Sequence, residues 1–222
     1  MLKERPILFN GDMVRALLDG RKTQTRRVLK SQPPEGCGLI EVEEYAPIVT
    51  NRKGEQQPGP DTFGAFSEDG EWSLKSPYGQ PGDRLWVRET FADGLCTKST
   101  LAYRATHKPI DLDEGWDEPI KWKPSIFMPR SYSRITLEIV SVRVERLQDI
   151  SEADALAEGI EPPEGETYRD YAVKPEDNEG HDYYLCPQDS FISLWEKING
   201  LESCKANPWV WVVEFKCLEV SS

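Results

Sequence analysis

The chain has 222 residues, of which 38% are apolar, and it carries a formal net charge of −12. This composition is sufficient for one buried core, so we expect a single domain over residues 1–222. No stretch approaches the roughly 20 apolar residues of a membrane-spanning helix, and the N-terminus has no signal-peptide pattern. We therefore expect a cytoplasmic protein with no membrane partner.

Positive charge is concentrated in two segments of this acidic chain. Residues 1–30 and 121–147 together carry a net charge of +9, and the remainder carries −21. The acidic remainder argues against a long polynucleotide partner, because affinity for phosphates comes from Lys and Arg. If both segments line one cleft, they could attract a phosphate or a nucleotide. Ordinary solvated faces are the simpler interpretation.

The cysteines and histidines predict neither a disulfide framework nor a metal site. The five cysteines form an odd set without a CxxC pair, so we expect reduced thiols. His107 and His181 are isolated. Because neither has a neighbouring ligand at metal-binding spacing, we predict no metal and no cofactor.

The N-terminal segment predicts a strand and a helix. Residues 5–9 have a strand pattern, and Asn10 or Asp12 can cap a helix that runs through Leu18. Gly20 suits the left-handed conformation that ends such a helix. We therefore expect a sharp turn after Gly20 and a second strand beyond it.

The middle of the chain predicts a long loop followed by two strands. Residues 31–80 are rich in Pro and Gly and have little periodicity, so we expect a loop rather than a second core. Residues 84–89 alternate, with Leu85 and Val87 on one face, which predicts a strand with one solvated face. A further strand is expected at 101–105.

The second half predicts two long strands and two helices. The longest strand pattern spans 135–147, and its change of phase near Ile139 predicts a β-bulge. The other expected elements are a helix capped by Asp149 or Ser151 and ended by Gly159, a helix at 188–199 with Phe191, Leu194, Trp195 and Ile198 inward, and a central strand at 209–220.

The expected fold class is therefore α+β, in one domain with three long loop insertions. The insertions lie at approximately 31–80, 106–121 and 161–188, where prolines, glycines and acidic residues interrupt the periodic patterns. The remaining segments have the length of a small barrel with flanking helices.

Four segments resemble an ASCH domain of the kind found in phage and prophage genomes. They run from Gly11 to Arg27, from Pro81 to Glu89, from Trp122 to Arg130 and from Pro208 to Lys216. The family is similar in fold to PUA domains. The resemblance therefore implies a PUA-like β-barrel flanked by short helices, with a cleft beside the first helix-strand corner.

The resemblance also implies a set of site residues. The family signature GxKxxExR matches at Gly20, Lys22 and Arg27, with Thr25 in place of the glutamate. One similar branch, with a Lys-Thr-x-Thr segment, comprises small amidohydrolases that remove acyl groups from N4-acetylcytidine. Its catalytic lysine, threonine and glutamate match Lys22, Thr25 and Glu158.

Deacylation of an exocyclic amide needs a nucleophile, a base and a stabilised oxyanion. The resemblance implies Thr25 as nucleophile, Lys22 as general base and Glu158 as the group that orients or shuttles the proton. Residues three apart in a strand face opposite sides, so this requires Lys22 in the turn and Thr25 in the strand. The simpler interpretation is a solvated lysine, an ordinary strand threonine and an exposed helix-end carboxylate.

Further polar and aromatic residues are candidate ligand contacts. Arg130 and Arg134 lie next to the turn at Met128-Pro129, where the N–H groups of their guanidinium side chains could bind a phosphate or the edge of a base. The two arginines are equally consistent with a basic segment that precedes a strand and binds no ligand. The candidate substrate-binding residues are Arg21, Arg26, Arg27, Glu89, Arg130 and Arg134. The candidate stacking residues are Trp86, Trp122, Trp209 and Trp211, of which the last two are more typical of a core.

Our leading hypothesis is a metal-independent amidohydrolase that deacylates a modified pyrimidine nucleoside or base. The alternative is a non-enzymatic PUA-like module that binds RNA or a nucleotide in the same cleft. A third interpretation is a phage accessory or regulatory factor that uses the insertions at 31–80 and 161–188. The sequence specifies neither the physiological substrate nor the oligomeric state.

Overall fold

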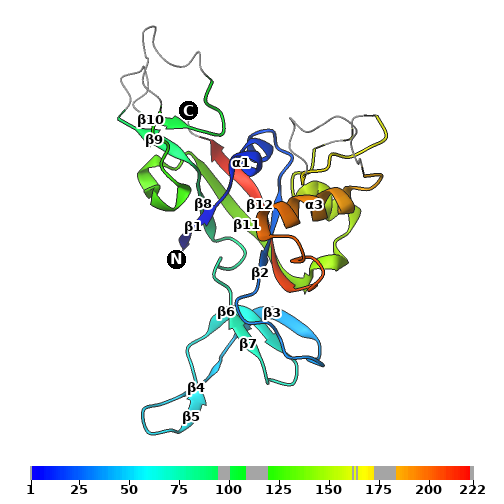
Figure 1. Ribbon diagram of the computed structural model, residues 1–222. Coiled ribbons are helices and arrows are strands. Elements are labelled where there is room, and N and C mark those ends of the chain that lie inside the picture. The colour runs from blue at the N-terminus through cyan, green and yellow to red at the C-terminus, as the bar shows by residue number, and fades with distance from the viewer. Residues whose placement is uncertain are drawn as a thin grey trace.

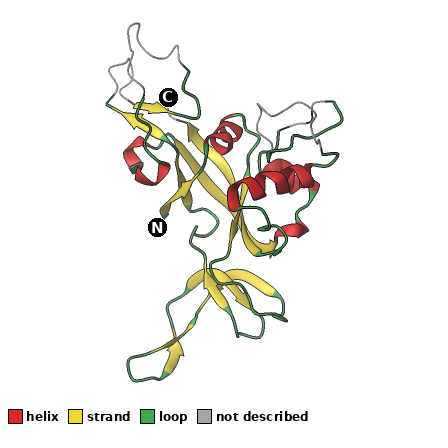
Figure 2. Ribbon diagram, viewed as in Figure 1, coloured by secondary structure: helices red, strands yellow, loops and turns green. Residues whose placement is uncertain are grey.

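A computed structural model describes residues 2–94, 101–108, 120–161, 163, 165–172 and 184–220. These residues form a mixed α+β fold in which strands predominate, as Figures 1 and 2 show, so the expected fold class is confirmed. Cys96, His181 and the acidic segment at 111–118 lie outside the described residues.

The elements follow the chain in an order close to the expected one. The strands are β1 (Glu4–Leu8), β2 (Gln24–Val28), β3 (Ile40–Tyr45), β4 (Ile48–Thr50), β5 (Gln56–Pro58), β6 (Thr62–Ser67), β7 (Ser73–Lys75), β8 (Arg84–Arg88), β9 (Phe91–Asp93), β10 (Leu101–Tyr103), β11 (Ile135–Arg146) and β12 (Trp209–Val220). The α-helices are α1 (Gly11–Leu18), α2 (Glu152–Ala157) and α3 (Pro187–Asn199). Short 3-10 turns are η2 (Ser125–Phe127), η3 (Arg130–Tyr132) and η4 (Leu147–Asp149).

The main sheet has five strands in the order β1-β8-β11-β12-β2. β1 runs parallel to β8, and the other pairs are antiparallel. β12 lies between β11 and β2, which confirms its predicted central place. The β11–β12 register shifts between Ile139 and Ser141, which confirms the predicted bulge.

The two edge strands of this sheet approach each other without pairing. Arg27 Nη2 in β2 donates a hydrogen bond to the backbone oxygen of Leu8 in β1 at 2.8 Å. No ladder joins the two strands in the part of the chain that the structure describes. Pro6 lies in β1 and lacks an N–H, which suits an edge strand. The expected closed barrel is therefore not confirmed, because the sheet stays open between β1 and β2.

Both faces of the main sheet are covered by apolar side chains. One face, with Leu85, Leu137 and Val213, belongs to a core that α1 joins through Val14 and Leu17. The other face forms a second apolar cluster with α2 and α3. That cluster includes Leu147, Ala155, Phe191, Val210 and Val212. β12 contributes to both clusters, which explains its nearly unbroken apolar sequence.

Residues 31–80, expected as a loop, contain five short strands. β3, β6 and β7 form a three-stranded sheet, and β4 pairs with β5 in a hairpin. Figure 1 shows this segment projecting from the main sheet, with the hairpin at its tip. Ala65 and Trp72 nevertheless belong to the same core as β8 and β11. The strands were missed because each is short and is separated from the next by Pro or Gly.

The helices form around the predicted caps. The Asn10 side chain accepts a hydrogen bond from the Met13 N–H, and the Ser151 side chain accepts one from the Asp154 N–H. The expected inward face of α3 is confirmed for Phe191, Leu194 and Trp195, which are buried. The prediction was wrong for Ile198, which is 42% exposed because it lies in the last turn of the helix.

Two further expectations concern membranes and cysteines. In the described part of the chain, no helix is both long enough and apolar enough to cross a membrane. Cys37, Cys186 and Cys204 form no disulfide.

Substitution of Gly159 by alanine tests how tightly the turn after α2 packs against its neighbours. Its φ is +94°, and an added Cβ would lie 2.8 Å from Ala16 Cβ and 3.0 Å from Lys22 Cβ. Gly20 also has a positive φ, +74°, but open space around it. Gly20→Ala should cost about 1 kcal/mol of unfolding free energy, and Gly159→Ala should cost about 1–3 kcal/mol more through overpacking. Urea denaturation measures both, and equal losses would contradict this packing.

Candidate functional site

A cavity of about 240 Å³ lies at the edge of the sheet formed by β2. Ligand pockets for drug-sized molecules are usually about 300–1,000 Å³, so this cavity suits a single base or a similar group. The charged residues that line it are Lys22, Arg26, Arg27 and Glu158, and all four are candidates from the sequence. Its other walls are Met13 from α1, Val28 from β2, Tyr78, and Phe191, Leu194, Trp195, Ile198 and Asn199 from α3.

Lys22 and Glu158 form a buried ion pair at this cavity. The prediction that Lys22 lies in the turn was wrong: it follows the turn at 19–20 and forms an isolated antiparallel β-bridge with Glu158 just before β2. Its side chain is fully buried. Lys22 Nζ donates to Glu158 Oε2 and to the backbone oxygen of Glu158, both at 2.8 Å. The lysine therefore also satisfies a free carbonyl at the C-terminal end of α2, where a cation is favourable.

Burial lowers the pKa of the Lys22 ammonium below its usual value. The charge and hydrogen bond of Glu158 oppose this shift without cancelling it, and Arg27 and Arg26 add to it as neighbouring cations. A buried lysine of lowered pKa beside a carboxylate and a cavity is an arrangement that acid-base sites use.

Thr25 does not join this pair. It lies opposite Val213 in the β2–β12 ladder and therefore shares the sheet face of that core residue. Gln24 and Arg26 lie on the other face, where both bond to Asp154. The Thr25 hydroxyl is buried and has no hydrogen-bond partner in the described structure. The expected Lys22–Thr25 contact is therefore wrong, because strand alternation separates the two side chains.

Arg26 is the centre of a buried charge network. Its side chain has no solvent exposure. It pairs with Glu145, with Asp154 at 3.1 Å and with Glu158 at 3.3 Å. Arg143 also contacts Asp154, at 3.0 Å. Burial raises the pKa of the Asp154 carboxyl. The hydrogen bond from Gln24, the charge of Arg143, and the charge and hydrogen bond of Arg26 outweigh burial and lower this pKa below its usual value. The network joins β2, β11 and α2.

Arg27 differs from its two cationic neighbours. Its Nη2 donates only to the neutral backbone oxygen of Leu8, and its guanidinium lies 5.5 Å from the centre of the Phe9 ring. Its Nε has no partner, and among the described residues it forms no ion pair with a carboxylate. Burial raises the pKa of Tyr78, and Arg27 partly opposes this shift. Tyr78 therefore presents a neutral phenol to the cavity.

Glu89 and the second basic segment form separate contacts. Arg134 Nε and Nη2 donate to the two oxygens of Glu89, both at 2.9 Å, and its guanidinium lies 4.0 Å from the centre of the Tyr103 ring. Arg130 Nε donates to Glu4 Oε2 at 3.0 Å. These arginines are therefore held by carboxylates near β1 and β8.

The structure does not bring all the predicted site residues into one cleft. Arg130 and Arg134 are paired with Glu4 and Glu89, and neither lines the cavity. Arg21 is closer, but its Nη1 donates to the backbone oxygen of Gly159 and its Nη2 pairs with Asp19. Arg21, Glu89, Arg130 and Arg134 do not line the cavity.

The aromatic residues at the cavity differ from those singled out in the sequence. Trp211 is a core residue, and Trp209 packs against Arg146. Trp195 lines the cavity instead, together with Tyr78. The period of α3 did predict Trp195 as inward-facing, but Tyr78 lies in the segment expected to be a loop, so no sequence pattern marked it.

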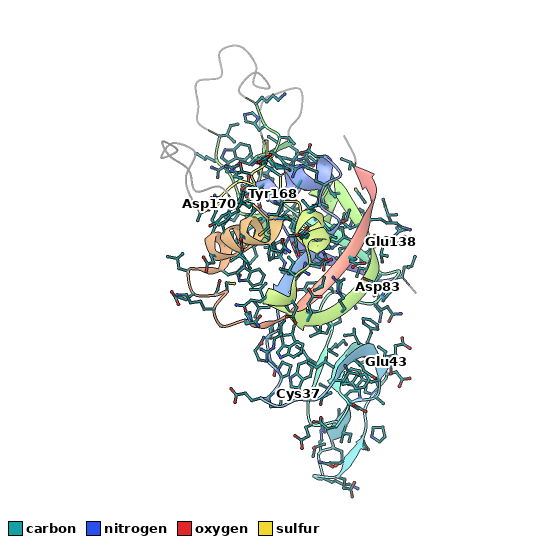
Figure 3. All side chains as sticks on the ribbon, turned by 90° about the vertical axis from the view of Figure 1, so that its right-hand side faces the viewer. Cys37, Glu43, Asp83, Glu138, Tyr168 and Asp170 are labelled. Carbon is teal, nitrogen blue, oxygen red and sulfur yellow. The ribbon has the colours of Figure 1, made fainter. Side chains whose placement is uncertain are left out.

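Part of the insertion at 161–188 covers α3 next to the site. Ser190 Oγ donates to the backbone oxygen of Arg169 at 2.7 Å, and the Tyr171 N–H donates to Ser193 Oγ at 2.9 Å. Figure 3 shows the labelled Tyr168 beside α3, on the other side of the molecule from the projecting segment. The insertion therefore supports the helix that forms the apolar wall of the cavity.

Comparisons with protein-family models, curated proteins and solved structures find no match to this chain. No group of three or more His, Cys, Asp or Glu side chains in the described ranges is arranged to hold a metal ion.

Thr25 tests whether its hydroxyl has a structural role. A buried hydroxyl without a partner destabilises the folded state, so its replacement by an isosteric methyl group removes a cost. Thr25→Val should raise the free energy of unfolding by about 1 kcal/mol. Chemical denaturation measures the change. A loss of 1 kcal/mol or more would show that the hydroxyl has a partner after all.

Lys22 predicts an unusual dependence of stability on pH. The folded state binds the Lys22 proton less tightly than the unfolded chain, so the stability cost of the buried ammonium is complete below the folded pKa. That cost disappears as the pH rises toward the ordinary lysine value. The unfolding free energy of the wild type should therefore rise relative to Lys22→Met as the pH increases toward the ordinary lysine pKa of about 10.4.

Urea denaturation at several pH values measures this difference. The exposed Lys53 provides a matched control, because Lys53→Met should track the wild type across the range. A difference between the wild type and Lys22→Met that shrinks with rising pH would contradict a lowered Lys22 pKa.

Proposed function

We propose that this protein is a metal-independent amidohydrolase of ASCH type that deacylates an N4-acylcytidine-like pyrimidine. The observation that carries the proposal is the contact between Lys22 and Glu158 at the cavity, 2.8 Å long and buried. These are two of the three residues that the resemblance implies, and they come from segments 136 residues apart. The proposed mechanism does not use the third residue, Thr25, because its hydroxyl does not contact the Lys22–Glu158 pair.

The reaction is best written with water as the nucleophile. Glu158 takes a proton from the water, and the resulting hydroxide adds to the acyl carbonyl carbon. The Lys22 ammonium, held against Glu158, stabilises the oxyanion that forms. When the C–N bond breaks, the proton returns through the Lys22–Glu158 pair to the leaving exocyclic amine. The products are the free amine of the pyrimidine and a carboxylic acid, which then ionises to a carboxylate and releases one proton to solvent.

The fold is compatible with a PUA-like barrel that is open along one seam. Every strand of the main sheet except β2 contributes apolar side chains to the core under α1. The seam between β1 and β2 is bridged by the Arg27 side chain rather than by a ladder. The cavity lies beside the turn after α1, which is where the resemblance places the cleft of the family.

A non-enzymatic binding module is the second candidate. The observation that favours it is the isolation of the Thr25 hydroxyl, which has no base within hydrogen-bonding distance. In addition, Lys22 already has two acceptors on Glu158, so the pair also has a purely structural use as a cap for α2. A cytidine-like ligand would then be held without turnover.

The decisive experiment follows the release of cytidine from N4-acetylcytidine. Wild-type protein and Thr25→Val should both turn over the substrate. Glu158→Gln should lower kcat by about a hundredfold or more, because it removes the base while keeping the side-chain shape. Lys22→Met should have a similar effect.

Thermal unfolding of each variant shows whether it is folded. Loss of turnover in folded Thr25→Val would restore the threonine as nucleophile and contradict the water mechanism. Absence of turnover in the wild type, with binding of the same compound, would support the binding module instead.

A further inference from the structure

Three donors on side chains that line the cavity have no acceptor in the described structure. The Trp195 indole N–H is buried and has no partner, and Trp195 is 5% exposed. The buried Nε atoms of Arg26 and Arg27 have none either. All three side chains line the cavity. Buried donors almost always have a partner, so these donors indicate an acceptor that arrives with a ligand.

The charge of the cavity indicates what kind of acceptor this is. Three cationic side chains and one carboxylate line the cavity. Lys22 and Arg26 are paired with carboxylates, but Arg27 contacts only a neutral carbonyl and an aromatic ring. Arg27 therefore brings a partly buried positive charge that has no carboxylate partner among the described residues, which favours an anionic ligand group.

We propose that Arg27 and Trp195 form an anion subsite for the phosphate of a pyrimidine nucleotide. The inference rests on the proposed function, since it takes the pyrimidine from there and adds the phosphate. Guanidinium and indole N–H groups both donate to phosphate oxygens, and the pairing with Arg27 is charge-assisted. The substrate is then an N4-acylated cytidine nucleotide rather than the free nucleoside.

The size of the cavity separates a mononucleotide from a polynucleotide. A volume of about 240 Å³ has room for one base and its immediate substituents. The protein outside the two basic segments carries a charge of −21, which repels a long phosphate backbone. A phosphate at the end of an RNA chain would offer the same chemistry, and the experiment distinguishes these sources.

The test compares the dissociation constants of cytidine, cytidine 5′-monophosphate and a 5′-phosphorylated tetranucleotide by isothermal titration calorimetry. The monophosphate should bind about 10- to 100-fold more tightly than cytidine, which is the range expected for a hydrogen bond to a charged group. The tetranucleotide should bind no more tightly than the monophosphate. Tighter binding of the tetranucleotide would assign the subsite to RNA ends and overturn the mononucleotide assignment.

Three variants test the assigned donors. Arg27→Gln removes the charge and Trp195→Phe removes the N–H while keeping an aromatic ring. Each should abolish most of the preference for the monophosphate and leave cytidine binding within about threefold. The matched control is Arg52→Gln, which makes the same charge change at an exposed position and should keep the preference. Equal preference in all variants would overturn the assignment.

The outcome is distinguishable from that of the proposed function. A phosphate preference that depends on Arg27, without release of cytidine from any acylated compound, supports the subsite and contradicts the hydrolase. Turnover of N4-acetylcytidine and of its 5′-monophosphate with the same kcat/KM, unchanged in Arg27→Gln, supports the hydrolase and overturns the subsite. Thermal unfolding confirms that Arg27→Gln and Trp195→Phe are folded.

Discussion

The buried guanidinium of Arg26 is the constraint on which the rest of the site depends. A charge without solvent contact is tolerated only when it is paired and hydrogen-bonded. Glu145, Asp154 and Glu158 meet this requirement, and they come from β11 and from α2 and its C-terminal end. The edge strand, the long central strand and the helix are thereby held in one arrangement, and Glu158 is presented to Lys22 as a result.

This constraint also determines the register of β2. A slip of one residue would exchange the faces of Thr25 and Arg26, leaving the three carboxylates opposite a hydroxyl. The guanidinium would then point into the apolar core under α1. The cost of either error is several kcal/mol, because breaking a buried ion pair typically costs about 3–5 kcal/mol. An edge strand with only one neighbour, β12, is therefore specified as firmly as a central one.

Local chemistry in the sequence predicted most of the main sheet and its helices. The caps at Asn10 and Ser151 and the bulge after Ile139 each depend on a few adjacent residues, and all three predictions were correct. Contacts between distant segments were predicted less well. The resemblance did identify Lys22 and Glu158, but the closure of the sheet and the Lys22–Thr25 contact depend on strand geometry that no local pattern records. Trp195 and Tyr78 were missed as cavity residues for the same reason.

The bridge between Arg27 and Leu8 has a consequence for how the cavity and the sheet are coupled. One side-chain hydrogen bond spans the seam between β1 and β2, and the same side chain forms a wall of the cavity. A ligand that engages the guanidinium must share it with the Leu8 carbonyl or displace it. Occupancy of the cavity and closure of the seam are therefore thermodynamically linked, and each must alter the other by the same factor. Under the proposed phosphate subsite, the hydrogen bond across the open edge of the sheet therefore responds to ligand binding.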